Sequence, residues 1–379
     1  MRPLSTPSIA LALVLSAGFI TVGAGAGAGA AERVQGRDSL VFANAKARLV
    51  VDLAGGAIGD FRRAATDLNP LHWGTPDPGD TSIHGFGHFL CLDRWGPPSD
   101  AEGTKGMPYH GEAANVQWSV TEEVVRKEGI AEGAMKAVLP KAGLSVHRRI
   151  RLSAAEPVFL VEEEITNENA LGRLYNAVQH PTVGPPFLDS ETVVDCNGRR
   201  GFAQGGSLPN PEEPSSYWPR AYNRDGQSVD LRRLTNDPNP NVATFAIDDS
   251  HGWVTAVSPS SRLLLGYLWK TSDYPWVSVW RDVREGRPVA RGLEFGTTGL
   301  HQPYPVLVKK GRLWDRPLFE YLDAGESVRK RYLAFLLEAP EGFAGVERVA
   351  LEAGRLVILE RTSGKPRELS VRVEASLAL

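Results

Sequence analysis

The feature that most constrains this chain is a succession of short apolar runs, bounded by glycine, proline, asparagine or charged residues, with no long helical period. In the run 157–169, Phe159, Val161 and Ile165 fall on one face of an extended strand, and Glu162 and Glu164 fall on the other. Strands at this spacing are typical of a sandwich or barrel. We therefore predict an all-β fold.

Further strands are expected on either side of turn residues. The stretch 47–63 is apolar on both sides of Gly55-Gly56, which predicts a hairpin. The stretch 205–241 is rich in Pro, Asn and Ser and predicts a long surface loop beside a site, with a disordered insert as the alternative. The other strand-like runs are 116–125, 131–140, 144–153, 262–271, 275–283 and 348–377.

The first 30 residues resemble a secretory signal peptide. An arginine precedes an apolar run from Ile9 to Val22, and small residues follow, with cleavage expected near Ala30 or Ala31. The run is short for a membrane span, so an uncleaved anchor is the alternative. We expect a secreted or periplasmic protein, with residues 31–379 forming a single domain and no membrane contact once the signal is removed.

Charge disfavours nucleic acid and anionic membranes as partners, and cysteine spacing gives no support for a zinc site. The formal net charge is −3 and no basic block is present, which disfavours nucleic acid and anionic membranes as partners. Cys91 and Cys196 lack zinc-ligand spacing. One disulfide and two separate buried thiols both remain open for an exported chain, as does the oligomeric state.

Three short motifs each contain a group that can transfer a proton near neutral pH. They are "MPYHGEAANVQW" with His110, "YNAVQHPTVGPPFLD" with His180, and "RGLEFGTTGLHQPYP" with Glu294. Taken singly, a histidine before Gly or Pro is more often an ordinary loop residue. A glutamate at a strand end is more often simply solvated.

Together, the order and spacing of the three motifs resemble the galactose mutarotase-like superfamily, which includes the aldose 1-epimerases. The His110-Gly111 pair with Trp118, the His180 turn and the strand-ending Glu294 carry the resemblance. The stretches 53–61 and 321–336 also resemble the family, so the likeness covers roughly 40–340. It implies a large antiparallel β-supersandwich with a sugar-binding cleft on its concave face.

The resemblance also implies roles for these side chains. Interconverting sugar anomers requires a base that takes the proton of the anomeric hydroxyl and an acid that protonates the ring oxygen. Glu294 would be the base and His180 the acid, while His110 would stabilise charge on the ring-oxygen side. The substrate would be a small-molecule sugar or saccharide, with no metal or organic cofactor.

Other residues are candidates for substrate contact. Sugar sites combine aromatic platforms with carboxylates and amides, although strand aromatics more often pack in the core. The glycines at 85 and 87 disfavour a helix that would pair His84 with His88 around a metal, so we interpret 82–100 as a loop bordering the cleft. The candidates are Asp93, Arg94, Trp95, Glu112, Trp276, Trp280 and Tyr304.

One departure from the family affects the function. Many relatives have an arginine shortly after the His-Gly pair, whereas here Glu112, Ala113, Ala114 and Asn115 follow Gly111. A sugar-phosphate substrate is therefore disfavoured. We predict an exported aldose 1-epimerase-like enzyme acting on an aldose or on the reducing end of a short saccharide. The alternatives are a carbohydrate-binding domain without turnover and a polysaccharide lyase-type enzyme, although no clear Tyr/Arg/His set supports the lyase.

Overall fold

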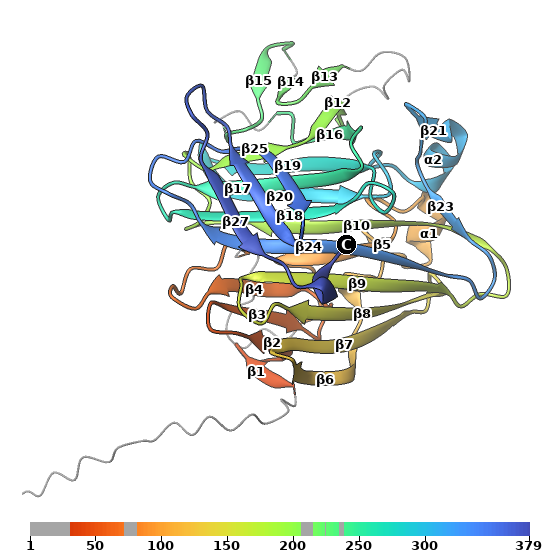
Figure 1. Cartoon of the computed structure of the whole chain (residues 1–379). Helices are drawn as coiled ribbons and strands as arrows, with labels where there is room; N and C mark the ends of the chain where they lie inside the picture. Colours follow the sequence, from red (N-terminus) through yellow and green to blue (C-terminus); the bar gives the residue numbers. More distant parts are fainter. Residues whose placement is uncertain (1–30, 72–81, 206–214, 224, 235–238) are drawn as a thin grey trace, which may run out of the picture.

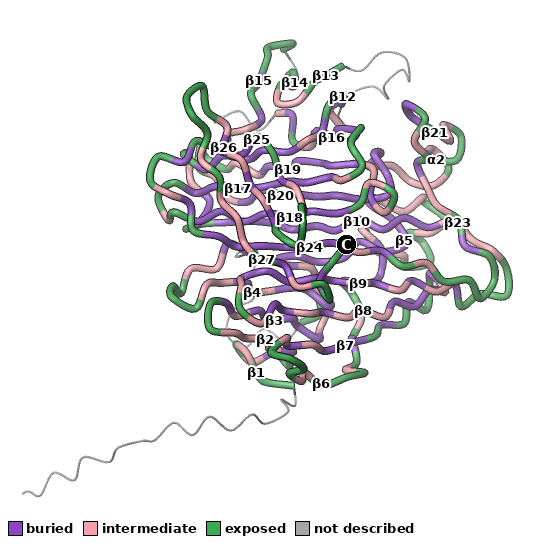
Figure 2. Tube along the Cα trace, viewed as in Figure 1, coloured by how far each residue is buried: buried purple, intermediate pink, exposed green. Residues whose placement is uncertain are grey.

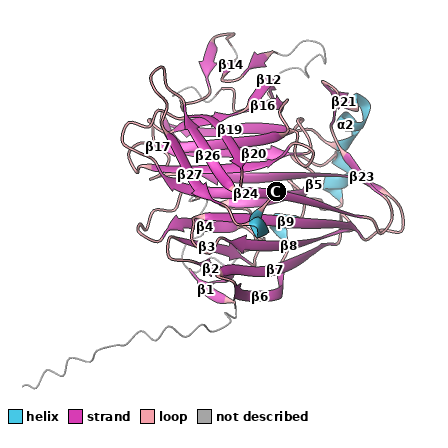
Figure 3. Ribbon diagram, in the orientation of Figure 1, coloured by secondary structure: helices cyan, strands magenta, loops and turns pink. Residues whose placement is uncertain are grey.

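The computed structural model describes residues 31–71, 82–205, 215–223, 225–234 and 239–379. These residues form mainly antiparallel β-sheet (Figures 1 and 3), which confirms the predicted fold class. The predicted signal peptide, residues 1–30, lies outside the described residues. No helix of the described segments is long and apolar enough to cross a membrane.

A 14-stranded sheet provides one layer. Its edge-to-edge path is β1 (Glu32–Val34), β2 (Arg37–Ala43), β3 (Ala47–Asp52), β4 (Ile58–Arg63), β5 (His88–Asp93), β10 (Arg173–Val183), β20 (Arg287–Gly296), β19 (Trp276–Arg284), β16 (Val242–Ile247), β12 (Gly198–Ala203), β13 (Ser216–Tyr217), β14 (Arg220–Tyr222) and β15 (Ser228–Asp230). Strand β23 (Glu320–Leu322) also pairs with β10. The hairpin predicted across Gly55-Gly56 is the β3–β4 pair.

An eight-stranded sheet provides the second layer. Its order is β11 (Val193–Cys196), β17 (His251–Ser258), β18 (Leu263–Lys270), β24 (Ser327–Glu338), β9 (Val158–Asn167), β8 (Leu144–Leu152), β7 (Ile130–Leu139) and β6 (Ser119–Lys127). The main hydrophobic core draws residues from both sheets, including Phe42 of β2 and Phe159 of β9. Figure 2 shows these central strands as largely buried.

A three-stranded C-terminal sheet packs on the outer side of the eight-stranded sheet (Figure 1). It consists of β25 (Val346–Glu352), β26 (Arg355–Glu360) and β27 (Glu368–Arg372). Its Val349, Leu356 and Ile358 share a second apolar cluster with Leu160 of β9 and Phe335 of β24. The eight-stranded sheet is therefore apolar on both faces in this region, because each face is covered.

Short elements complete the fold. The connections contain two helices, α1 (Asp100–Thr104) and α2 (Tyr304–Lys310), the 3₁₀ turn η1 (Ala113–Asn115), and the strand pair β21 (Arg312–Leu313) and β22 (Arg316–Pro317). The 3₁₀ turn η2 (Ala375–Leu377) follows the last strand. The stretch 205–241, expected to be a loop, contains β13–β15 in its described part. These strands extend the large sheet beyond β12, because their backbones pair in sequence and bury Ala221 and Val229.

Candidate functional site

His110 is held at the site by an unusual backbone turn. It has φ +64°, and Gly111 follows with φ +77°. A Cβ at Gly111 would lie 1.9 Å from the carbonyl oxygen of Leu92, so only glycine fits beside β5. The His110 amide donates to the Gly96 carbonyl at 3.0 Å, and the Gly96 amide donates to Nδ1 of His110 at 3.1 Å. The close approach to β5 therefore explains why a glycine follows His110, and the two hydrogen bonds to Gly96 explain how His110 is held in place.

His180 and Glu294 meet across two neighbouring strands. His180 lies on β10 and Glu294 on β20, which pair antiparallel in the middle of the large sheet. The Nε2 atom of His180 lies 3.4 Å from Oε1 of Glu294, and both side chains are buried. Phe89 of β5 stacks on the His180 ring, with centroids 4.4 Å apart. Packing and strand register thus fix the relative position of the two groups.

Two aromatic residues and two further histidines surround the His180–Glu294 pair. The indole Nε1 of Trp95 donates to Oε2 of Glu294 at 2.6 Å. The His110 ring lies with its centroid 5.5 Å from His180 and 5.5 Å from His301. His301 Nε2 also contacts the hydroxyl of Tyr109 at 2.9 Å. The three sequence-predicted groups, His110, His180 and Glu294, therefore converge, together with His301 and Tyr109.

Burial shifts the proton affinities of the acid–base groups in opposite directions. It raises the pKa of Glu294 from 4.5 to about 8, and the Trp95 hydrogen bond only partly offsets this. It lowers the pKa of His180 to about 3 and that of His301 to about 4. It also lowers the pKa of His110 well below its ordinary value. Burial therefore favours the uncharged pair, with the titratable proton on Glu294 rather than on His180.

The hydrogen bonds also determine which ring nitrogens carry protons. Because the Gly96 amide is a donor, Nδ1 of His110 is the acceptor, and the neutral ring carries its proton on Nε2. His180 Nδ1 lies 3.0 Å from the hydroxyl of Thr182. Because burial favours the protonated form of Glu294, whose Oε1 faces Nε2 of His180, the neutral His180 ring carries its proton on Nδ1, toward Thr182. His180 Nε2 then presents a lone pair toward Glu294, while His110 is a hydrogen-bond donor.

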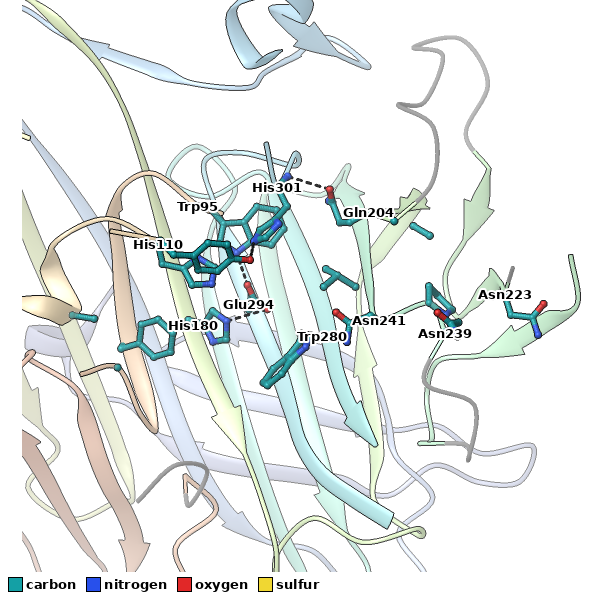
Figure 4. Close-up of a pocket in the computed structure, with 18 of the residues that line it drawn as sticks. Trp95, His110, His180, Gln204, Asn223, Asn239, Asn241, Trp280, Glu294 and His301 are labelled. Carbon is teal, nitrogen blue, oxygen red and sulfur yellow. Dashed lines mark hydrogen bonds and ion pairs between the residues drawn. The ribbon is translucent and has the colours of Figure 1, made fainter. Parts of the chain in front are cut away.

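These groups line a cavity of about 710 Å³. Figure 4 shows Trp95, His110, His180, Glu294 and His301 together at one end. Trp280 and the amide side chains Gln204, Asn223, Asn239 and Asn241 continue the lining toward the other end. Concave sites of this size, combining aromatic rings with a few polar groups, are typical of small-molecule binding. The geometry can hold a neutral polar ring against an acid, a base and a further donor.

Four of the predicted substrate contacts lie outside this lining. Asp93 and Arg94 are fully buried and pair with each other at 2.6 Å, and Arg94 also pairs with Glu102 at 2.8 Å. Tyr304 donates its hydroxyl to the Asp93 carbonyl. Buried charges require such partners. Glu112 is also buried and accepts the Ala142 amide at 2.7 Å. The structure therefore places Asp93, Arg94, Glu112 and Tyr304 in the support of the loops behind the site, outside the cavity lining.

Trp95 and Trp280, the two remaining predicted contacts, both line the cavity, whereas Trp276 is buried in a neighbouring apolar cluster. Sequence reasoning missed His301 and Tyr109. Both stand inside the quoted motifs, seven residues after Glu294 and directly before His110. Of the missed amides, Asn241 directly precedes β16 and falls in the stretch 205–241 that was predicted to lie beside a site, whereas Gln204, directly after β12, carries no local signal.

His84, His88 and the two cysteines contact other protein groups or are buried, and they do not line the cavity. His84 is paired locally with Ser82, and His88 is buried with Nε2 3.0 Å from the Gln179 side chain. Gln179 continues to Glu163, which forms a buried ion pair with Arg148 at 2.7 Å. Cys91 and Cys196 are buried free thiols, so the structure contains the unpaired alternative. In the described part of the chain, no group of three or more His, Cys, Asp or Glu side chains is arranged to hold a metal ion.

Comparison with solved structures identifies the architecture. A galactose mutarotase-related enzyme from Lactobacillus acidophilus matches with a TM-score of 0.55 and 13% identity, over 80% of this chain and 99% of that one. A galactose mutarotase-like protein from Clostridium acetobutylicum matches with a TM-score of 0.57 and 14% identity, over 81% and 97% of the two chains.

The same architecture also occurs within a longer protein. A TPR-domain containing protein from Parabacteroides distasonis matches with a TM-score of 0.53 and 10% identity, over 80% of this chain and 48% of that one. No protein-family model and no curated protein sequence matches this chain. The structural matches nevertheless agree with the fold that the resemblance implies. The chain has the galactose mutarotase-like β-sandwich fold.

Proposed function

We propose that this protein interconverts the anomers of an aldose, or of the reducing end of a short saccharide, by acid–base ring opening. The observation that carries the proposal is the buried His180–Glu294 pair, 3.4 Å apart in the cavity, with the His110 ring 5.5 Å from His180. Fold alone does not determine a reaction. The proposal therefore rests on this arrangement of groups.

In the proposed reaction, Glu294 and His180 share one proton. Transfer of that proton across the 3.4 Å gap converts the neutral pair into carboxylate and imidazolium. The carboxylate then takes the proton of the anomeric hydroxyl, while His180 protonates the ring oxygen. The C1–ring oxygen bond breaks, the aldehyde rotates, and reclosure on its other face gives the second anomer and returns the protons.

His110 has a separate role in this scheme. Its Nε2–H is the donor that the Gly96 hydrogen bond leaves available, because that bond occupies Nδ1. A donor fixed by the backbone stabilises negative charge that develops on a sugar oxygen without reorganising during the reaction. His110 therefore acts as a neutral hydrogen-bond donor, in keeping with its lowered pKa.

Anomer exchange measured by NMR or polarimetry tests the proposal. Purified protein should accelerate exchange of at least one aldose above the buffer rate, and Glu294→Gln and His180→Asn should each abolish most of this acceleration. His147→Asn is the matched control, because His147 lies on β8 and contacts Thr121 at the surface. If no aldose or reducing disaccharide exchanges faster than buffer, the enzyme proposal is wrong.

A carbohydrate-binding domain without turnover is the second candidate. It is favoured by the occurrence of this fold within the longer TPR-domain containing protein and by the residues after Gly111. There Ala113 and Ala114 are buried in η1 and offer no charged contact. Glycan binding that persists in a His180→Ala/Glu294→Gln double variant, with no exchange by the wild-type protein, would identify this function.

We also propose that the protein is exported. The support is the order of an arginine, an apolar run and small residues within 1–30. Expression of the full chain in a Gram-negative host, followed by mass measurement of the periplasmic fraction, should give a mature N-terminus near Ala30 or Ala31. Uncleaved protein confined to the cytoplasm would contradict export.

A further inference from the structure

The cavity extends well beyond the acid–base groups. Its volume of about 710 Å³ lies in the upper part of the range of roughly 300–1,000 Å³ that holds drug-sized ligands. Figure 4 shows Asn239 and Asn223 at the end away from His110 and Glu294, with Trp280 and Asn241 between. A single sugar ring at the histidines would leave this second half of the cavity to another group.

Aromatic rings are placed along that second half. The centroid of the Trp280 ring lies 6.0 Å from that of the His180 ring, so Trp280 is directly beside the acid–base pair. Tyr222, at the end of β14, also lines the cavity and is 50% exposed. Aromatic faces pack against the apolar C–H faces of sugars. The cavity thus offers one platform beside the reacting ring and another farther out.

The amide groups of the lining are held in fixed orientations. Asn241 Nδ2 donates to the Arg281 carbonyl at 2.8 Å. Gln204 donates to Thr244 at 2.6 Å and to the Gly299 carbonyl at 2.8 Å. Its Oε1 also accepts the His301 amide at 3.1 Å. Side chains already held by such bonds can recognise hydroxyl groups with little loss of rotamer entropy on binding.

The chemistry of the lining favours an uncharged ligand. Among the described residues that line the cavity, Glu294 is the only carboxyl group, and none is lysine or arginine. A phosphate or uronate would be desolvated there without a cationic partner among these residues, which is unfavourable. Hydroxyl groups need only the amides, the imidazoles and the tyrosines.

We propose that this cavity binds an uncharged saccharide of two or more sugar units. The reducing-end ring lies beside His180 and Glu294. The next unit lies over Trp280 and extends toward Asn241 and Tyr222. The assignment of the first ring rests on the proposed anomer exchange, whereas the second subsite rests on the outer half of the cavity alone.

Kinetics with matched sugars test the second subsite. We expect at least one of maltose, cellobiose and lactose to exchange with a kcat/KM about 10-fold above that of glucose or galactose. Tyr222→Ala should reduce the disaccharide-to-monosaccharide ratio about 5-fold, mainly through KM, because it removes one aromatic contact. Tyr217→Ala is the control, since Tyr217 lies on the adjacent strand β13, is 62% exposed and is not part of the lining.

The outcomes separate the two proposals. If monosaccharides exchange but disaccharides show no advantage, or Tyr222→Ala and Tyr217→Ala behave alike, the second subsite is wrong and the enzyme proposal stands. If no sugar exchanges, calorimetry decides: disaccharide binding weakened by Tyr222→Ala supports the subsite without turnover, and its absence overturns it. Tighter binding of a uronate-containing disaccharide than of its neutral counterpart would overturn the uncharged class.

Discussion

The hydrogen bond from Trp95 to Glu294 gives a direct test of the electrostatics of the site. Trp95→Phe keeps an aromatic ring but removes the indole N–H that lies 2.6 Å from Oε2 of Glu294. This bond favours the ionised carboxylate, and its loss should raise the pKa of Glu294 above its value of about 8. A hydrogen bond to a charged group contributes about 1.5–3 kcal/mol, and about 1.4 kcal/mol corresponds to one pH unit, so the midpoint should rise by roughly 1 to 2 pH units.

The assay is a ¹³C NMR titration of the glutamate side chains, with Glu294 assigned by the signal that disappears in Glu294→Gln. Trp276→Phe is the matched control, because Trp276 is buried on β19 and its indole Nε1 has no hydrogen-bond partner among the described residues. The control should leave the Glu294 midpoint unchanged. An unchanged or lowered midpoint in Trp95→Phe would refute the reasoning, since it would mean that the bond does not stabilise the carboxylate. Where anomer exchange is measurable, the alkaline limb of its pH profile should move in the same direction.

Three further predictions concern stability measured by urea unfolding. Because the pKa of Glu294 is raised from 4.5 to about 8 by burial, the wild-type protein loses stability as pH rises through this window. Glu294→Gln should therefore gain stability relative to wild type between about pH 5 and about pH 9, and a constant difference would contradict the buried, protonated carboxyl. Gly111→Ala places a Cβ against the Leu92 carbonyl and should cost about 3 kcal/mol; a cost below the error would show that the turn relaxes freely. Glu163→Gln breaks a buried ion pair and should cost about 3–5 kcal/mol, whereas Glu164→Gln, at a partly exposed surface pair, should change little; equal effects would contradict the burial of the first pair.

Much of the strand pattern was predictable because it is encoded locally. The alternation of Phe159, Val161 and Ile165 places these residues in the core between the sheets, as the period of two requires. The outer face of the same strand was less readable. Val158 and Leu160 are buried there only because the C-terminal sheet covers them, and no local pattern indicates a cover from residues so distant in sequence.

The site likewise contains residues that local sequence could predict and residues whose contacts it could not. His110, His180 and Glu294 could be selected from motifs because each lies in a short stretch with a distinct sequence. The environments of Asp93, Arg94 and Glu112 could not be predicted. Whether a carboxylate faces a ligand or an internal partner depends here on Arg173, 80 residues from Asp93, and on the Ala142 amide, 30 residues from Glu112. Arg94 is engaged by Glu102 of the following helix.

The C-terminal sheet has a practical consequence for handling this protein. Leu160, Leu264 and Phe335 lie beneath β25–β27 in the second apolar cluster. A shortened chain that stops before Val346 would keep every residue of the acid–base site but would expose this apolar face to water. Exposed apolar surface of this kind drives self-association. Loss of activity in such a truncation would therefore report precipitation rather than a role of the last strands in chemistry, and tags or fusions are better joined after Leu379 than in place of these strands.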